Sequence, residues 1–135
     1  MPSEAKKQAE IAHALVKSLF DDGRLDEEQV EQFAEAKKFD EANAAIAAMA
    51  NIPVAVAESM MVETRAEGVM ILAKVAGLSW PTVKSIIHMR DELSGGEPTD
   101  LQVCKGTYER LRPSTAQQVL RFHRMQQTVP PTPAA

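Results

Sequence analysis

Few residues of the chain have the type and spacing of a catalytic or metal-binding site. The three histidines, His13, His88 and His123, fall in three different predicted helices, and no two of them have the i, i+4 spacing of a helical metal site. The only cysteine, Cys104, lies in an apolar helical pattern, which favours a thiol in the core over a nucleophile. The acidic run that begins at Asp21 lacks the alternating spacing of a calcium loop and is explained by helix capping. We therefore expect no enzyme activity, no metal and no cofactor.

The strongest local pattern is a helix-turn-helix over Gly68–Arg90, GVMILAKVAGLSWPTVKSIIHMR. Gly77 fits the left-handed cap of the first helix, and the hydroxyl of Ser79 is predicted to cap the second. DNA-binding units share this spacing. In such a unit the residues facing the DNA groove would be Trp80, Lys84, Ser85 and His88. A net charge of −4 and a pI near 5.4 argue against DNA, because phosphate neutralisation supplies most of that affinity, so DNA binding is the alternative function.

Trp80 is the only tryptophan, and it stands in the first turn of a predicted helix beside Pro81. One interpretation is that its ring caps the helix by packing over the preceding turn. The other is that it is an aromatic anchor at a protein interface, where tryptophan is enriched among the residues that dominate binding. The sequence leaves both interpretations open.

An all-α framework is predicted to position these residues. Apolar residues make up 44% of the chain and aromatic residues only 4%, which suits closely packed helices better than a β-sandwich. Along the first helix Ile11, Leu15 and Leu19 recur every four residues, with Ala12 and Val16 beside them, and predict one buried face. The stretches Asp26–Gln29 and Ser114–Gln117 have the spacing of capping boxes. Hydrophobic periodicity predicts about eight helices, near residues 3–20, 26–38, 39–50, 53–62, 68–76, 79–93, 99–111 and 114–126.

Three junctions between predicted helices share a pattern, an aliphatic residue followed within three positions by Pro53, Pro81 or Pro113. Helix pairs repeated in this way bury a continuous core only when they stack together. The predicted fold is therefore all-α, with the helices stacked as antiparallel pairs in a superhelical repeat. It forms a single domain over residues 1–127, with a joint at 94–98 and a disordered, Pro-rich tail at 128–135.

Composition also predicts the compartment. One cysteine excludes an internal disulfide and fits a reducing environment. The longest unbroken apolar run, Ala44–Ala50, has seven residues, against the roughly 20 that cross a bilayer. The first residues contain no apolar region of the signal-peptide type. We expect a cytoplasmic protein that does not associate with membranes.

Charge is distributed unevenly along the chain. Residues 1–70 contain 7 Lys or Arg and 14 Asp or Glu, a net charge of −7, whereas residues 71–135 contain 8 and 5, a net charge of +3. One interpretation is that both halves are simply solvated. The other is that the halves meet different partners, or each other in an oligomer.

Three stretches carry a resemblance to a known family: Leu19–Leu25 (LFDDGRL), Phe39–Pro53, an alanine-rich helix that ends in MANIP, and Leu72–Pro81 (LAKVAGLSWP). Through them, residues 17–90 resemble the uncharacterised alphaproteobacterial family of HEAT-like α-helical repeat proteins, a domain of unknown function. The resemblance covers a little over half of the chain. It implies an all-helical superhelical stack with an interaction role, and it brings no catalytic residues.

These observations predict a non-catalytic module for protein–protein interaction, regulatory or scaffolding in role. Val119, Leu120, Phe122 and Met125 are spread around the last predicted helix, so one packing contact cannot bury all four. The exposed apolar surface predicts either a weak homodimer or a partner domain docked on this helix. The candidate interface residues are Trp80, Lys84, His88, Phe122 and Met125.

Overall fold

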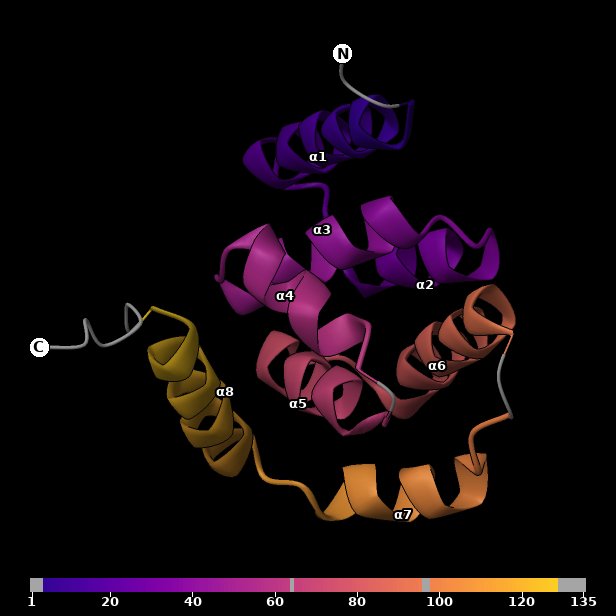
Figure 1. The fold of residues 1–135 in the computed structure, drawn as a ribbon, viewed down its shortest axis with the longest axis vertical. Helices are drawn as coiled ribbons and strands as arrows, with labels where there is room; N and C mark the ends of the chain where they lie inside the picture. The colour runs from indigo at the N-terminus through magenta and orange to yellow at the C-terminus, as the bar shows by residue number, and fades with distance from the viewer. Residues whose placement is uncertain (1–3, 64, 96–97, 129–135) are drawn as a thin grey trace, which may run out of the picture.

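The computed structural model describes residues 4–63, 65–95 and 98–128 (Figure 1). Within these residues the chain forms eight α-helices and no strand, so the predicted all-α fold of about eight helices is confirmed. The helices are α1 (Glu4–Asp21), α2 (Glu27–Glu35), α3 (Phe39–Ala50), α4 (Val54–Met61), α5 (Glu67–Ala76), α6 (Trp80–Ser94), α7 (Leu101–Arg110) and α8 (Pro113–Thr128). Residues 96 and 97 of the predicted joint, and the predicted tail beyond Thr128, lie outside the described residues.

The alanine-rich helix α3 is the centre of the fold. It contacts α1, α2, α4, α5 and α6, and its buried residues are consecutive: Ala42, Asn43, Ala44, Ala45, Ile46 and Ala47. Small side chains all around a helix let its neighbours approach closely from several sides. Among the helices of the described residues, none alone has the length and apolar character that a bilayer crossing requires. Helices α3 and α4 meet those criteria only when taken together, across a bend of 118°.

Two of the three predicted helix pairs pack as pairs, α3 with α4 and α5 with α6. In the third pair, α7 packs against α6, whereas α8 packs mainly against α5 (Figure 1). Leu111 between them is extended, with φ −73° and ψ 124°. Helix α8 then begins at Pro113, because a proline in the first turn of a helix loses no hydrogen bond through its missing N–H. Ser114 therefore lies inside the helix, and the prediction that it is the N-cap is wrong. The extended link carries α8 away from α7.

The predicted buried face of α1 is wrong in part. Ala12 and Val16 are buried and Leu19 is half-buried, but Ile11 is 69% exposed and Leu15 is 47% exposed. Helix α1 makes its main contact with one neighbour, α3, and a single neighbour covers only a narrow stripe of a helix. The buried stripe of α1 is therefore the one that contains Ala12 and Val16.

The predicted helix cap is confirmed at α2 but not at α6. The Asp26 carboxylate accepts a hydrogen bond from the Gln29 N–H at 2.9 Å, as predicted. Ser79 starts α6, but its hydroxyl makes no cap, so that prediction is wrong. Instead Glu27 of α2 accepts hydrogen bonds from the Ser79 N–H at 2.6 Å, from the Ser79 hydroxyl, and from Thr82 Oγ1 at 2.8 Å. A carboxylate stabilises a helix N-terminus more than a neutral hydroxyl does, because it also opposes the helix dipole.

Candidate interaction surface

The sharp corner between α3 and α4 is built by three residues. Asn51 adopts the left-handed conformation, with φ 58° and ψ 52°, which asparagine tolerates better than most residues. The Ile52 N–H donates to the Ala47 carbonyl at 3.0 Å and closes the last turn of α3. Pro53 is extended and prevents the helix from continuing. Asn51 and Ile52 are therefore held at a rigid corner.

Two pockets adjoin this corner. On one side a pocket of about 410 Å³ separates the corner from α5 and α8. It is lined by Ala50, Asn51, Ile52, Val75, Gln117, Leu120, Arg121, Arg124 and Met125. A second pocket, of about 280 Å³, is lined by Phe20, Ala47, Ala48, Asn51, Ile52 and Pro53. Because the two pockets share Asn51 and Ile52, we describe them together as the corner groove.

Helix α8 forms the far wall of the corner groove and is held by a narrow contact. Ala116 and Leu120 are its buried hydrophobic residues, 0% and 4% exposed. A polar contact between His123 Nε2 and the Ser59 hydroxyl of α4, at 3.2 Å, adds to them. Other apolar residues of α8, Val119, Phe122 and Met125, are exposed.

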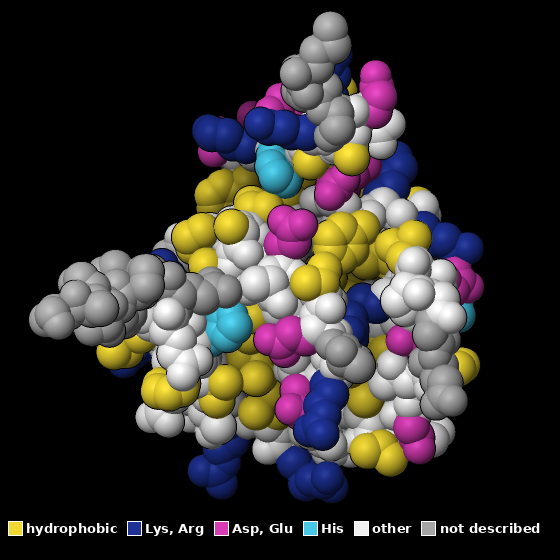
Figure 2. Space-filling view, viewed as in Figure 1, with side chains coloured by type: hydrophobic (Ala, Val, Ile, Leu, Met, Phe, Trp, Pro, Cys, Tyr) yellow, Lys and Arg dark blue, Asp and Glu magenta, His cyan; other side chains and the backbone are white. Residues whose placement is uncertain are grey.

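The structure exposes both residues of α8 that the sequence assigned to an interface. Phe122 is 61% exposed and Met125 is 57% exposed, and Val119 beside them is 40% exposed. Met125 lines the corner groove, whereas Phe122 is not among its lining residues. Figure 2 shows hydrophobic side chains, in yellow, exposed beside α8 and beneath α1 on one face of the molecule. The exposed surface of α8 therefore has two parts, one in the groove and one outside it.

The other predicted interface residues lie on α6, and α5 separates that helix from α8 (Figure 1). Trp80 is half-buried, and its ring centroid is 6.1 Å from that of Tyr108 on α7. The Tyr108 hydroxyl donates to the Leu78 carbonyl at 2.5 Å, and Lys74 Nζ lies 3.9 Å from the Tyr108 ring centroid. Burial raises the pKa of Tyr108 to about 12. The Trp80 ring thus packs inside the fold, near Tyr108 and the turn between α5 and α6. Only part of the ring is exposed for contact with another protein.

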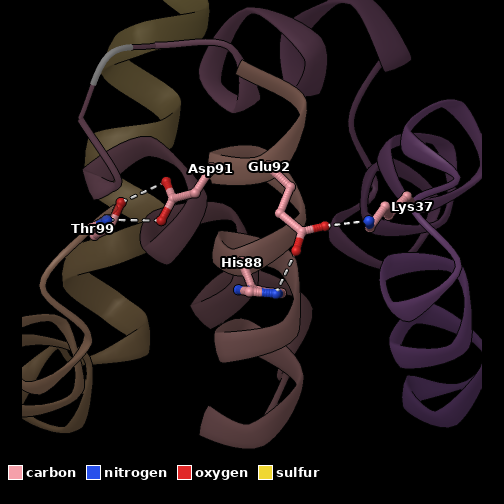
Figure 3. A network of polar contacts seen from close by, with 5 residues as sticks. All are labelled: Lys37, His88, Asp91, Glu92 and Thr99. Carbon is pink, nitrogen blue, oxygen red and sulfur yellow. Dashed lines mark hydrogen bonds and ion pairs between the residues drawn. The ribbon is translucent and has the colours of Figure 1, made fainter. Parts of the chain in front are cut away.

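Lys84 and His88 are exposed on α6, and His88 belongs to a polar network (Figure 3). Glu92 contacts His88 Nε2 at 3.0 Å and Lys37 Nζ of the α2–α3 turn at 2.5 Å. The hydrogen bond from Lys37 lowers the pKa of Glu92. Glu92 therefore lies beside His88 on α6, and His88 is one of the residues that would face DNA in a helix-turn-helix unit.

Asp91, the neighbour of Glu92, holds the connection that leads to α7. Its two carboxylate oxygens accept from the Thr99 N–H and the Thr99 hydroxyl, both at 2.8 Å (Figure 3). Asp100 then caps α7 by accepting from the N–H groups of Gln102 and Val103. Thr99, the residue that follows the predicted joint at 94–98, is therefore tied to α6.

The remaining candidates for chemistry are separated or buried. His13, His88 and His123 lie on α1, α6 and α8, and no group of three or more His, Cys, Asp or Glu within the described residues could hold a metal ion. Cys104 is 8% exposed, as its apolar pattern predicted, and burial raises the pKa of its thiol. A buried thiol with a raised pKa is a poor nucleophile.

Sequence reasoning missed the corner groove itself. Its lining residues come from α1, α3, α5, α8 and the α3–α4 turn, which are far apart in the chain, and only Met125 was predicted at an interface. One signal was present: an alanine-rich helix followed by Asn51-Ile52-Pro53 predicts an abrupt change of direction. Nothing in the sequence around Arg121 and Arg124, apart from their charge, indicated that they would line a pocket.

Comparison with known proteins identifies the relationship of the chain. The family model described as "Uncharacterised protein conserved in bacteria (DUF2336)" matches residues 1–121. No curated protein and no solved structure matches the chain.

Proposed function

The chain belongs to the bacterial DUF2336 family, and from that premise we propose that it is a non-catalytic α-helical module that binds another protein in the cytoplasm. The observation that carries the proposal is the corner groove together with the exposed apolar residues of α8, Phe122 and Met125. Contiguous exposed apolar surface next to a groove is typical of interaction sites. The groove is positioned by the rigid corner at Asn51, so it is preformed for a partner.

The ionisable groups with shifted pKa values support binding over catalysis. Burial by itself raises the pKa of Glu27, but the hydrogen bonds from Ser79 and Thr82 outweigh it, so the pKa lies below its ordinary value. The raised pKa values of Tyr108 and Cys104 follow from burial in the contact between α7 and the rest of the fold. The pKa shifts of Glu27, Tyr108 and Cys104 are thus explained by helix capping or burial, and none of these residues lines the corner groove. In enzymes, by contrast, the groups with shifted pKa values gather in the active-site cleft.

The alternative function is DNA binding by the helix-turn-helix at residues 68–90, formed here by α5 and α6. In such units the N-terminal residues of the second helix contact the bases. Here Glu27 occupies the N-terminus of α6, and Glu92 lies beside His88 on the same helix. Two carboxylates next to the DNA-facing surface would repel phosphate, so the geometry supports the alternative less well.

We further propose that the α3–α4 and α5–α6 pairs are two units of a HEAT-like stack. Each pair turns at a left-handed residue, Asn51 or Gly77, followed by an aliphatic residue and a proline. Helix α3 packs on α5, which places one pair against the next. Stacked pairs create extended surfaces that bind proteins in other repeat folds.

The test uses three full-length baits immobilised against a lysate of the native host. They are the wild type, the double variant Phe122→Glu/Met125→Glu, and the control Val103→Glu, whose residue on α7 is 63% exposed, similar to Phe122. We expect a protein that the wild type and Val103→Glu retain and the double variant loses. Sedimentation equilibrium of the same variants shows whether that protein is a second copy of the chain, as in the predicted weak homodimer. Identical retention by all three baits, or by none, contradicts the proposal.

Gel shifts at low salt with random duplex DNA test the alternative. We expect no retardation. Retardation that falls steeply with salt and disappears in Lys84→Glu would favour DNA binding, because it would show phosphate contacts from the exposed face of α6.

A further inference from the structure

We propose that the outer face of α1, formed by Ile11, Ala14, Leu15 and Ser18, pairs with the same face of a second copy of the chain. The two helices run antiparallel about a two-fold axis. This inference goes beyond the proposed function, because it assigns a second interaction surface and leaves α8 to a different protein.

Helix α1 has one side that the fold leaves uncovered. Its buried residues are Ala12 and Val16, and its main neighbour is α3. Ile11 and Leu15 are four residues apart and therefore lie on one side of the helix, where they are 69% and 47% exposed. In Figure 1 α1 lies at the edge of the fold and packs along one side only. Two large apolar side chains exposed together are typical of an interaction surface.

The outer face has a shape that a second helix can fit. With about 3.6 residues per turn, Ala14 and Ser18 lie on the helix surface beside Ile11 and Leu15, and all four are exposed. The two small residues leave gaps between the two large ones. Side chains of a facing helix can insert into such gaps.

The two ends of the outer face carry opposite charges. Lys7 lies one turn before the face, and Asp22 lies one turn after Ser18. Helical geometry continues to Asp22, because its N–H donates to the Ser18 carbonyl at 3.0 Å. Both side chains are exposed, and neither makes an ion pair within the described residues, in contrast to Lys17 and Asp21, which pair at 2.8 Å.

This charge pattern is complementary to itself only in an antiparallel pair. When the two-fold axis passes between Ala14 and Leu15, Lys7 of each copy lies opposite Asp22 of the other. A parallel pair would instead bring Lys7 next to Lys7 and Asp22 next to Asp22, where like charges repel. Glu4, one turn beyond Lys7, extends past the last turn of the other helix and opposes no charge there. The dipoles of two antiparallel helices also attract each other.

The same register is complementary in size. It places Ile11 of one copy opposite Ser18 of the other, and Leu15 opposite Ala14, so each large side chain meets a small one. The size and charge patterns thus select one alignment, and a surface that matches its own copy in this way forms a closed dimer. Only two large apolar side chains per copy are covered, fewer than in stable interfaces, so the dimer should form in the micromolar range.

Sedimentation equilibrium of the full-length chain, from low to high micromolar concentration, tests this inference. We expect the wild type to dimerise reversibly and Ile11→Glu to stay monomeric, because a charge would enter the middle of the apolar contact. The controls Val103→Glu on α7, where the residue is 63% exposed, and Phe122→Glu on α8 should dimerise like the wild type. Thermal unfolding of Ile11→Glu should match that of the wild type, since the residue is exposed.

Charge reversal tests the antiparallel register. Lys7→Glu and Asp22→Lys should each weaken dimerisation about tenfold, because each replaces two attractive contacts of the dimer with repulsive ones. The double variant Lys7→Glu/Asp22→Lys should regain the affinity of the wild type, since the two charges are exchanged. Lys105→Glu, at an exposed lysine of α7, should leave dimerisation unchanged.

Three results would overturn the inference. They are a wild type that remains monomeric at high micromolar concentration, a dimer that Phe122→Glu dissociates and Ile11→Glu leaves intact, and equal dimerisation of the single and double charge variants. In each case capture of a protein through α8 would still stand. Loss of that capture would in turn leave the α1 dimer intact, so the two proposals fail separately.

Discussion

Helices α5 and α8 pack on each other, yet they use their apolar residues differently. Helix α5 also contacts α3, α4 and α6, and it buries Gly68, Val69, Met70, Leu72 and Ala73. Helix α8 has α5 as its main neighbour and leaves Val119, Phe122 and Met125 exposed. Both helices carry enough apolar residues for a core. The number of neighbours, not the apolar content, decides which residues become core and which become surface.

Helix α7 lies at the edge like α8, but a few specific contacts hold it. Its buried residues are Cys104 and Tyr108. The hydroxyl of Tyr108 bonds to Leu78 in the α5–α6 turn, and Asp91 of α6 fixes Thr99 just before α7 begins. The edge of the fold is thus attached at a few points, whereas the centre is packed continuously. This difference predicts how strongly each region contributes to stability.

The largest difference is expected between the same substitution in the two helices. Leu72→Ala in α5 should lower the free energy of unfolding by about 3–5 kcal/mol, because a residue enclosed on all sides leaves a cavity. Leu120→Ala in α8 should cost about 2 kcal/mol, because the edge of the groove can relax around it. Equilibrium urea unfolding measures both. Equal losses would show that α8 is as much part of the core as α5.

Hydrogen exchange distinguishes the two variants further. Leu120→Ala should speed amide exchange mainly in α8, through local opening, and Leu72→Ala should speed it in every helix.

Two helical glycines should respond to alanine with opposite signs. At Gly68 in α5 a Cβ would lie 2.6 Å from the backbone oxygen of Met60, which cannot move easily, so Gly68→Ala should cost about 1–3 kcal/mol. At Gly106 in α7 the nearest atom would be Arg110 Nη1, at 3.6 Å, so Gly106→Ala should add about 1 kcal/mol through helix propensity. Thermal unfolding of the two variants gives the signs directly. Destabilisation by Gly106→Ala would mean that the edge is packed more tightly than the contacts indicate.

The smallest expected effect is that of Tyr108→Phe, about 1 kcal/mol at neutral pH, for the loss of the hydrogen bond to Leu78. The pKa of Tyr108 rises from 10.0 in the unfolded chain to about 12 in the folded chain, so the neutral hydroxyl is favoured on folding. Its contribution is therefore fully present below about pH 10 and is lost as the pH rises towards 12. The difference in unfolding free energy between wild type and Tyr108→Phe should shrink over this range.

A second measurement is available because the chain has one tyrosine. Phenolate absorbance of the folded protein then reports Tyr108 alone, and titration near pH 10 would contradict the buried hydrogen bond.

Local rules determined most of the secondary structure of this protein from its sequence. The 3.6-residue period, the cap at Asp26 and the left-handed Gly77 each act within a few positions, and each is where the sequence placed it. The exposure of Phe122 and Met125 also followed from the sequence, because four apolar residues around one helix exceed what one neighbour can cover.

Tertiary structure alone decided which stripe of α1 is buried, which group caps α6, and where the groove lies. Ile11 and Leu15 fit a buried face as well as Ala12 and Val16 do, and only the close approach of α3 chooses between them. Glu27 lies 52 residues before Ser79, so nothing local could assign it to the start of α6. The corner groove likewise joins Asn51 to Arg121 across the fold. The physical reason is the same in each case: a cap or a period needs only neighbours in the chain, whereas covering a face or forming a pocket needs the partners that folding brings from far away.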